Sequence, residues 1–159
     1  MTMDSRIENS HLPTNSNLQI NQSIDSEKLS LFAKRILIVD DDPDITLTFK
    51  KGLEAENEKS SNMFFNVDSC NNPLQALSEF KPNYYDLILI DINMPIMDGI
   101  ELSNKILELD ANVKICLVTA GEANIDVLRE LYPMRSIGCF IKKPVTIEYL
   151  VRRIKAELE

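Results

Sequence analysis

From residue 35 onwards, two patterns of apolar positions alternate along the chain. The first is a short, nearly continuous apolar run rich in Ile, Leu and Val, which is typical of a strand buried on both faces of a sheet. The second places an apolar residue at every third or fourth position, which is typical of a helix with one buried face. Together they predict strands at 36–39, 64–68, 86–90, 114–118 and 138–142, and helices at 44–56, 73–80, 99–109, 123–132 and 146–158.

The alternation of strands and helices predicts the fold class. Buried strands joined by amphipathic helices indicate a parallel sheet with helices on both faces, and right-handed crossovers limit how such a sheet can be connected. Five strand–helix units favour an α/β fold of the flavodoxin-like, doubly wound (βα)5 type, with a five-stranded parallel sheet in the order 2-1-3-4-5. In that order, the first, third, fourth and fifth strands are consecutive neighbours, and their carboxyl ends meet at one edge.

Residues 1–34 follow neither pattern. They are rich in Asn and Ser, with isolated apolar residues and no periodicity, which predicts a disordered or weakly ordered tail. The single histidine, His11, lies in this segment, where we expect a surface residue without a role. The sequence thus divides into a tail at 1–34 and one folded domain at 35–159.

The charge and the short apolar runs argue against several classes of protein. The chain of 159 residues has 25 acidic against 17 basic side chains and a net charge of −8. This balance argues against direct binding of nucleic acid, whose phosphates attract clusters of Lys and Arg. Apolar runs of about four residues are far short of the roughly 20 needed to cross a bilayer, and no secretory leader is recognisable. We therefore expect a cytoplasmic protein without membrane insertion.

The three cysteines are Cys70, Cys116 and Cys139, and two of them lie within predicted strands. Their number is odd and no CxxC pair is present, which argues against a metal or redox motif. We expect buried thiols in a reducing cytoplasm.

Polar residues with phosphoryl or metal chemistry follow four of the predicted strands. Asp40 and Asp41 follow the first, Asp91 the third, Thr119 the fourth and Lys143 the fifth. Each of these is common at a turn or a helix cap when it stands alone, so their joint placement is what carries meaning. Three carboxylates, a hydroxyl and an ammonium at one edge of a sheet predict a pocket for Mg²⁺ and a phosphoryl group.

The chemistry expected of this pocket follows from its charges. Three neighbouring carboxylates repel one another, and a divalent cation with oxygen ligands relieves that repulsion. Asp91 stands alone at the end of the central strand, where a carboxylate can attack phosphorus and form an acyl phosphate. Lys143 and the hydroxyl of Thr119 can bind oxygens of the transferred phosphoryl group.

Four segments of the chain resemble the receiver domain of response regulators from two-component systems. They are RILIVDDDPDI, LILIDINMPIMDG, LVTA and CFIKKP, and the resemblance covers residues 35–159. The segment around Asp91 is the most specific of the four. One departure is the stretch that contains Pro133, which should end the fourth helix early and alter the details of the signalling face.

The resemblance implies roles for the acidic residues. Asp91 resembles the phosphoacceptor of the family. Asp41 resembles the direct Mg²⁺ ligand, with Asp40 acting directly or through water. Asn93, two residues after the acceptor, resembles the position whose backbone carbonyl binds the metal.

The resemblance also implies roles at the fourth and fifth strands. Thr119 resembles the switch hydroxyl that moves toward the phosphoryl group, and Phe140 resembles an aromatic switch residue that turns inward. Lys143 rather than its neighbour matches the lysine of the family, because it directly precedes Pro144. The family often has a cis peptide bond at this position, where proline makes that form accessible.

A function is implied as well. A single-domain response regulator accepts a phosphoryl group on Asp91 from a sensor histidine kinase or a phosphotransfer protein, in a Mg²⁺-dependent reaction. The face formed by the fourth helix, fifth strand and fifth helix then changes shape and binds a downstream protein target. Such a protein is not an enzyme, beyond slow self-phosphorylation from small donors and self-dephosphorylation, and we expect a monomer or a weak dimer.

Two alternatives remain open at this point. A receiver-like scaffold would bind its partners without being phosphorylated. A phosphatase of the haloacid dehalogenase type would use Asp40 and Asp42 after the first strand. The Pro43-Asp44 pair that follows departs from the motif of those enzymes, and the sequence predicts no cap domain.

Overall fold

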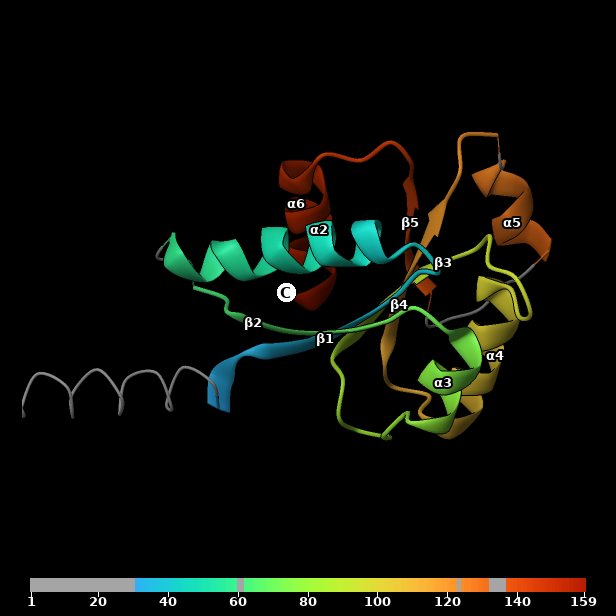
Figure 1. The fold of residues 1–159 in the computed structure, drawn as a ribbon, viewed down its shortest axis with the longest axis horizontal. Helices are drawn as coiled ribbons and strands as arrows, with labels where there is room; N and C mark the ends of the chain where they lie inside the picture. The colour runs from blue at the N-terminus through green and yellow to red at the C-terminus, as the bar shows by residue number, and fades with distance from the viewer. Residues whose placement is uncertain (1–30, 60–61, 123, 132–136) are drawn as a thin grey trace, which may run out of the picture. The chain divides into compact units, whose positions relative to one another are not determined.

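The strands form one parallel five-stranded sheet in the order β2-β1-β3-β4-β5, as predicted (Figure 1). The computed structural model describes residues 31–59, 62–122, 124–131 and 137–159. In this part of the chain the strands are β1 (Lys34–Val39), β2 (Phe65–Cys70), β3 (Leu87–Asp91), β4 (Lys114–Thr119) and β5 (Ile137–Lys142). All neighbouring pairs are parallel, which confirms the doubly wound, flavodoxin-like arrangement.

Helices cover both faces of the sheet. They are α2 (Pro43–Glu54), α3 (Pro73–Ser78), α4 (Gly99–Leu109), α5 (Ile125–Leu131) and α6 (Ile147–Leu158), with a short 3-10 helix η1 (Ala55–Glu58) after α2. Helices α2 and α6 pack on one face, whereas α3, α4 and α5 pack on the other. Each predicted helix is present, and the main difference is that the end of the first one is wound as η1.

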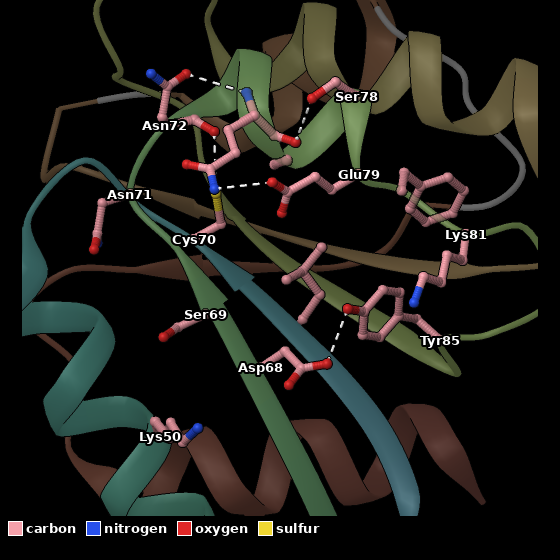
Figure 2. Close-up of a pocket in the computed structure, with 14 residues that line it drawn as sticks. Lys50, Asp68, Ser69, Cys70, Asn71, Asn72, Ser78, Glu79, Lys81 and Tyr85 are labelled. Carbon is pink, nitrogen blue, oxygen red and sulfur yellow. Dashed lines mark hydrogen bonds between the residues drawn. The ribbon is translucent and has the colours of Figure 1, made fainter.

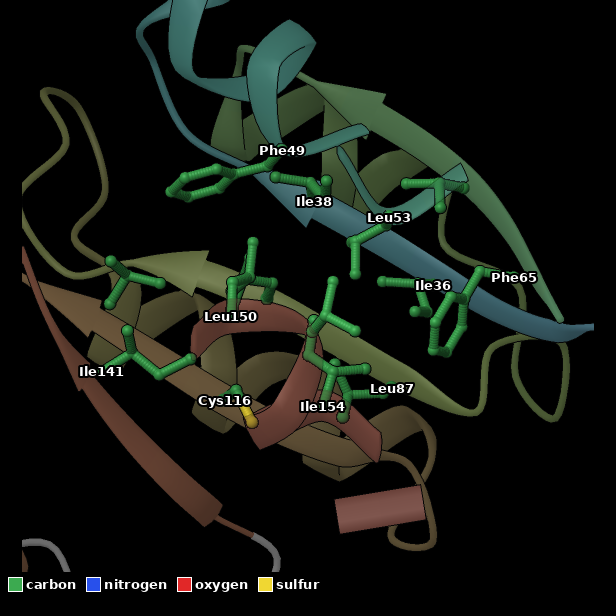
Figure 3. Close-up of a cluster of buried hydrophobic side chains, with 14 of the residues drawn as sticks. Ile36, Ile38, Phe49, Leu53, Phe65, Leu87, Cys116, Ile141, Leu150 and Ile154 are labelled. Carbon is green, nitrogen blue, oxygen red and sulfur yellow. The ribbon is translucent and has the colours of Figure 1, made fainter. Parts of the chain in front are cut away.

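The core consists of two apolar clusters, one on each face of the sheet. Successive residues of a strand point to opposite faces, so Ile36 and Ile38 of β1 join one cluster while Leu37 and Val39 join the other. Figure 3 shows the cluster beneath α2 and α6, with Phe49, Leu53, Phe65, Leu87, Ile141, Leu150 and Ile154 among its members. Because the central strands are packed on both sides, their carboxyl ends form a rigid platform for a site.

Side-chain caps define where the helices begin. Asp42 caps α2, Asn72 caps α3, Asp98 caps α4 and Thr146 caps α6, each by accepting a hydrogen bond from a backbone N–H of the first turn. These bonds satisfy N–H groups that have no partner within the helix. The acidic turn after β1 therefore runs into a well-defined helix start.

The structure corrects the prediction made for the cysteines. Cys116 of β4 and Cys139 of β5 are buried as expected, but a disulfide joins them, with their Cα atoms 4.6 Å apart. The pairing depends on an irregular register, because Ile115 pairs with Ile137 whereas Cys116 pairs with Cys139. Cys70 is the free cysteine of the described residues.

Some predictions fall outside the described residues. The tail predicted at 1–34 falls mostly within residues 1–30, as does His11, and Pro133 lies in the stretch 132–136. Residues Ala33–Glu159 form one compact unit in their internal contacts. Among the described helices, none combines the length and the apolar character that crossing a membrane requires.

Candidate functional site

The sheet brings the predicted site residues to its carboxyl edge. Asp40 directly follows β1, Asp91 is the last residue of β3, and Thr119 is the last residue of β4. Lys143 directly follows β5, and its backbone N–H donates to the carbonyl of Thr119 at 2.8 Å. Because β1, β3, β4 and β5 are consecutive neighbours, these side chains come from four adjacent strand ends.

Three carboxylates lie together at this edge. One oxygen of each of Asp40, Asp41 and Asp91 falls within 4.8 Å of the others. Asp40 and Asp91 are buried, with 3% and 5% of their surface exposed, whereas Asp41 is exposed. The cluster thus has two acids held inside the protein and one that faces solvent.

The ammonium of Lys143 lies between the two buried carboxylates. Its Nζ is 2.9 Å from Oδ2 of Asp40 and 3.3 Å from Oδ1 of Asp91. The preceding residue, Lys142, is exposed, so Lys143 is the lysine of the cluster. The Lys143-Pro144 peptide bond is cis, as the resemblance implied.

Burial and neighbouring charges shift two pKa values in the cluster. Burial raises the pKa of the Asp91 carboxyl; the Lys143 ammonium opposes this rise, and the charges of Asp40 and Asp41 add to it. Burial alone would lower the pKa of Lys143, but the hydrogen bond to Asp40 and the charge of Asp91 outweigh it, so the pKa is raised. Lys143 is therefore held in its charged form, and Asp91 lies where further positive charge is favoured.

The loop between β3 and α4 folds closely back against Asp91. The N–H of Gly99 donates to the carbonyl of Ile92 at 2.9 Å, and a Cβ at position 99 would overlap the carbonyl oxygen of Asp91. Only glycine fits there without a shift of the backbone. Asn93 is exposed in this loop, two residues after Asp91, and Ile96 adopts a φ of 74° with 76% of its surface exposed.

The two predicted switch residues lie on β4 and β5. Thr119 is fully buried, and its hydroxyl donates a 3.2 Å hydrogen bond to the carbonyl of Ala120. Phe140 is partly buried against the cluster on the α3 and α4 side, and the guanidinium of Arg129 from α5 lies 5.4 Å from the centre of its ring. Thr119, at the end of β4, therefore lies one strand away from the ring of Phe140, and that ring contacts Arg129 of α5.

Asn71, which directly follows β2, is part of the site but was not predicted. Its side-chain nitrogen donates to the backbone carbonyl of Asp40 at 2.8 Å and to the hydroxyl of Thr46 at 2.9 Å. The only signal in the sequence is an amide side chain at the end of the second strand. Which carbonyl it reaches depends on how β1 and β2 pair.

Comparison with known families assigns the chain to a class of proteins. The family model described as response regulator receiver domain matches residues 36–155. The chain belongs to this family.

The receiver domain is similar to parts of larger signalling proteins. It is 30% identical over 124 residues to the transcriptional regulatory protein PrrA of Mycobacterium tuberculosis, a match that covers 78% of this chain and 49% of PrrA. It is 34% identical over 125 residues to the sensor protein EvgS of Escherichia coli K12, covering 78% of this chain and 9% of EvgS. The chain spans about half the length of the first relative and a small part of the second.

Solved receiver domains share the fold. A CheY-like response regulator receiver domain protein from Methanospirillum hungatei JF-1 is 30% identical, with a TM-score of 0.64 over 79% of this chain and 94% of that one. The receiver domain of the Francisella response regulator 1452 is 23% identical, with a TM-score of 0.65 over 79% and 96% of the two chains. The second likeness shows the fold alone.

The acidic residues of this receiver domain suit Mg²⁺. Mg²⁺ binds oxygen ligands, takes one or two carboxylates from the protein and keeps several waters. Asp40, Asp41 and Asp91 offer three carboxylates in one cluster, and one of them faces solvent. The cluster contains neither a thiolate nor an imidazole, the ligands that mark most zinc sites.

A separate hollow of about 1010 Å³ lies between β2 and α3 of the receiver domain (Figure 2). Its lining includes Lys50, Asp68, Asn71 and Tyr85. The hydroxyl of Tyr85 donates to Asp68 at 2.9 Å, and burial together with this hydrogen bond raises the pKa of Tyr85. The three clustered carboxylates do not line the hollow. Asn71 connects the two, because it lines the hollow and its side chain donates to the backbone carbonyl of Asp40.

Proposed function

We propose that this receiver domain accepts a phosphoryl group on Asp91 in a Mg²⁺-dependent reaction and signals through the face formed by α5, β5 and α6. A sensor histidine kinase or a phosphotransfer protein would be the donor, and the face would bind a downstream protein target. One observation carries the proposal: the Lys143 ammonium is 2.9 Å from Asp40 and 3.3 Å from Asp91, in a cluster that includes Asp41. Phosphoryl transfer depends on such positioning and charge neutralisation.

The transfer requires an ionised acceptor. An oxygen of Asp91 would attack the phosphorus of a phosphohistidine; the O–P bond forms as the P–N bond breaks, and the electron pair of the broken bond stays on the imidazole. The charge of Lys143 favours the ionised form of Asp91 against the effect of burial. After transfer, Lys143 would pair with an oxygen of the phosphoryl group. A bound Mg²⁺ would supply further positive charge at the phosphoryl oxygens.

The hydrogen bonds of Asp40 support different roles in Mg²⁺ binding for Asp40 and Asp41, the two acids after β1. Oδ1 of Asp40 accepts from the backbone N–H of Asp42 at 2.9 Å, and Oδ2 accepts from Lys143 at 2.9 Å. Both oxygens are thus already bonded, which favours Asp41 as the direct Mg²⁺ ligand and Asp40 as a ligand through water. The backbone carbonyl of Asn93 would be a further ligand.

The signal would pass to the binding face through Thr119 and Phe140. The hydroxyl of Thr119 would exchange its 3.2 Å bond to Ala120 for a bond to the phosphoryl group. Phe140 would then turn inward, and α5 would follow because Arg129 lies over the ring. In this mechanism a local charge biases an element that has two arrangements.

The phosphatase alternative needs Asp42 as a second acid of the site. Oδ1 of Asp42 instead accepts from the backbone N–H groups of Asp44 and Ile45, as the N-cap of α2. This use of the side chain argues against a catalytic role. The chemistry of the chain would then be limited to self-phosphorylation from small donors and self-dephosphorylation.

We further propose that the domain works in the cytoplasm as a monomer or a weak dimer. A net charge of −8 disfavours close association of identical copies. A disulfide is unusual for a cytoplasmic protein. The burial of Cys116 and Cys139, at 0% and 1% exposed, would shield this one from reductants.

Labelling by a small acyl phosphate tests the proposed function. In the presence of Mg²⁺, the wild-type chain should gain the mass of one phosphoryl group, whereas Asp91→Asn should gain none, because an amide cannot form the acyl phosphate. Intact-protein mass spectrometry measures both. Asp44→Asn, which removes an exposed acid of α2, is the matched control and should be labelled like the wild type. Label on the Asp91→Asn variant would contradict the proposal that Asp91 is the phosphoacceptor. A wild-type chain that remains unlabelled would favour the alternative of a receiver-like scaffold that is not phosphorylated.

A further inference from the structure

Asn71 connects the end of β2 to the acidic turn after β1. It is exposed and is one of the residues that line the hollow between β2 and α3 (Figure 2). Its side-chain nitrogen donates to the carbonyl of Asp40 and to the hydroxyl of Thr46, and these two residues are only 3% and 2% exposed. A surface amide thus places both of its N–H donors on buried residues of the site.

Every polar group of Asp40 has a partner. Its N–H donates to the carbonyl of Cys70 at 3.3 Å, and its carbonyl accepts from Asn71 at 2.8 Å. Its carboxylate accepts from Asp42 and Lys143, each at 2.9 Å. The carboxylate is therefore held by groups of the pocket, whereas the backbone of Asp40 is held by two successive residues at the end of β2.

The second bond of Asn71 extends this hold to the start of α2. The hydroxyl of Thr46 accepts from Asn71 and donates to the carbonyl of Pro43 at 3.0 Å. The acidic turn lies between Asp40 and Pro43, so one amide ties both of its ends. Asp41, the acid proposed to bind Mg²⁺ directly, belongs to this turn.

We propose that Asn71 is a positioning residue of the Mg²⁺ site, which orients the turn that carries Asp40 and Asp41 without touching the cation. The inference rests on the proposed function and deepens it. Residues that hold metal ligands in place typically change metal affinity by roughly 10–100-fold when they are removed. Because Asn71 is exposed and belongs to neither apolar cluster of the core, the fold survives the loss of its hydrogen bonds while the turn becomes less ordered.

The variant Asn71→Asp separates positioning from charge. The side chain keeps its shape and loses both donors, and its added negative charge would by itself attract a cation. Weaker Mg²⁺ binding by this variant therefore cannot result from the added charge and would have to come from the lost hydrogen bonds. Asn72→Asp is the matched control, because it adds the same charge one residue away, and aspartate caps a helix about as well as asparagine.

We expect Asn71→Asp to raise the Mg²⁺ dissociation constant of the full chain about tenfold, measured by calorimetric titration with MgCl₂, and Asn72→Asp not to raise it. In labelling by a small acyl phosphate, the Mg²⁺ concentration for half-maximal labelling should rise by the same factor. The rate at saturating Mg²⁺ should remain that of the wild type. A purely structural role would instead reduce labelling at every Mg²⁺ concentration.

A second variant covers the case in which Asn71→Asp does not fold. Asn71→Ala removes both donors without adding a charge, and thermal unfolding in EDTA checks the fold of each variant. Wild-type Mg²⁺ affinity in either folded variant overturns the proposal, and so does loss of the fold in both. A wild-type chain that binds no Mg²⁺ overturns the proposed function as well, which keeps the two failures distinct.

Discussion

At Gly99, the backbone passes so close to Asp91 that no side chain has room. A Cβ there would overlap the carbonyl oxygen of Asp91 and lie 2.8 Å from the Cα of Ile92. These are backbone atoms at the end of β3, so they cannot turn aside as the end of a flexible side chain can. The start of α4 and the backbone of Asp91 are therefore held in direct contact.

We predict that Gly99→Ala lowers the free energy of unfolding by about 1–3 kcal/mol, because the backbone must shift to admit the methyl group. The same shift should reduce labelling of Asp91 by a small acyl phosphate. Urea unfolding in EDTA measures the stability. Gly121→Ala is the matched control and should cost little, because nothing lies within 4 Å of the added Cβ. Equal stability of the two variants would show that the loop accommodates the methyl group.

The sequence identified site residues that the topology brings together, but not those whose partners depend on register. Asp40, Asp41, Asp91 and Lys143 meet because they end adjacent strands of a parallel sheet, and the order of the strands follows from the alternating pattern. Asn71 donates to a backbone carbonyl and a hydroxyl of another segment. No spacing along the chain indicates which acceptor an amide will reach.

At the scale of elements, β4 and β5 are joined covalently as well as by backbone hydrogen bonds. Ile137 and Cys139 pair with successive residues of β4, which leaves Gly138 between them without a partner in the ladder. This bulge brings Cys139 opposite Cys116 (the latter is labelled in Figure 3). The strands could be predicted from apolar runs, but the bulge could not, and for that reason the prediction of free thiols was wrong.

We predict that the protein purified without reductant has one reactive thiol after denaturation, that of Cys70, and three after reduction. Alkylation followed by mass spectrometry counts the thiols. The Cys70→Ser variant should have no reactive thiol before reduction and two after it. Reduction should also lower the free energy of unfolding by about 3 kcal/mol, because the bond closes a loop across 23 residues. Three thiols before reduction would show that Cys116 and Cys139 are not bonded.

At the scale of the whole molecule, a sheet packed on both faces holds mutually repelling acids in place. The alternation of apolar runs and periodic stretches sufficed to predict this architecture, because burial on two faces leaves the strands few alternative arrangements. The fold keeps Asp91 largely out of water beside Asp40 and Asp41, with Lys143 as the compensating charge. The stability of the domain should therefore respond to the charge of the site.

Ionisation of Asp91 should destabilise the folded state when no metal cation is bound. Burial and the neighbouring acids raise its pKa above the ordinary value of 3.8, in spite of Lys143. A carboxyl whose pKa is raised by folding favours the folded state at pH values below 3.8. This contribution is lost as the pH rises through the higher pKa of the folded state. At neutral pH, a neutral amide or a bound cation should relieve the cost.

We predict that in EDTA at neutral pH Asp91→Asn unfolds a few degrees above the wild type, and that the difference shrinks as the pH falls through the raised pKa of the wild-type Asp91 carboxyl, which then takes up a proton. Mg²⁺ should stabilise the wild type, by about 2.7 kcal/mol at 100 times its dissociation constant, and the variant much less. Differential scanning calorimetry measures both effects, with Asp44→Asn as an exposed control. An Asp91→Asn chain less stable than the wild type in EDTA would mean that the ion pair with Lys143 outweighs burial and repulsion.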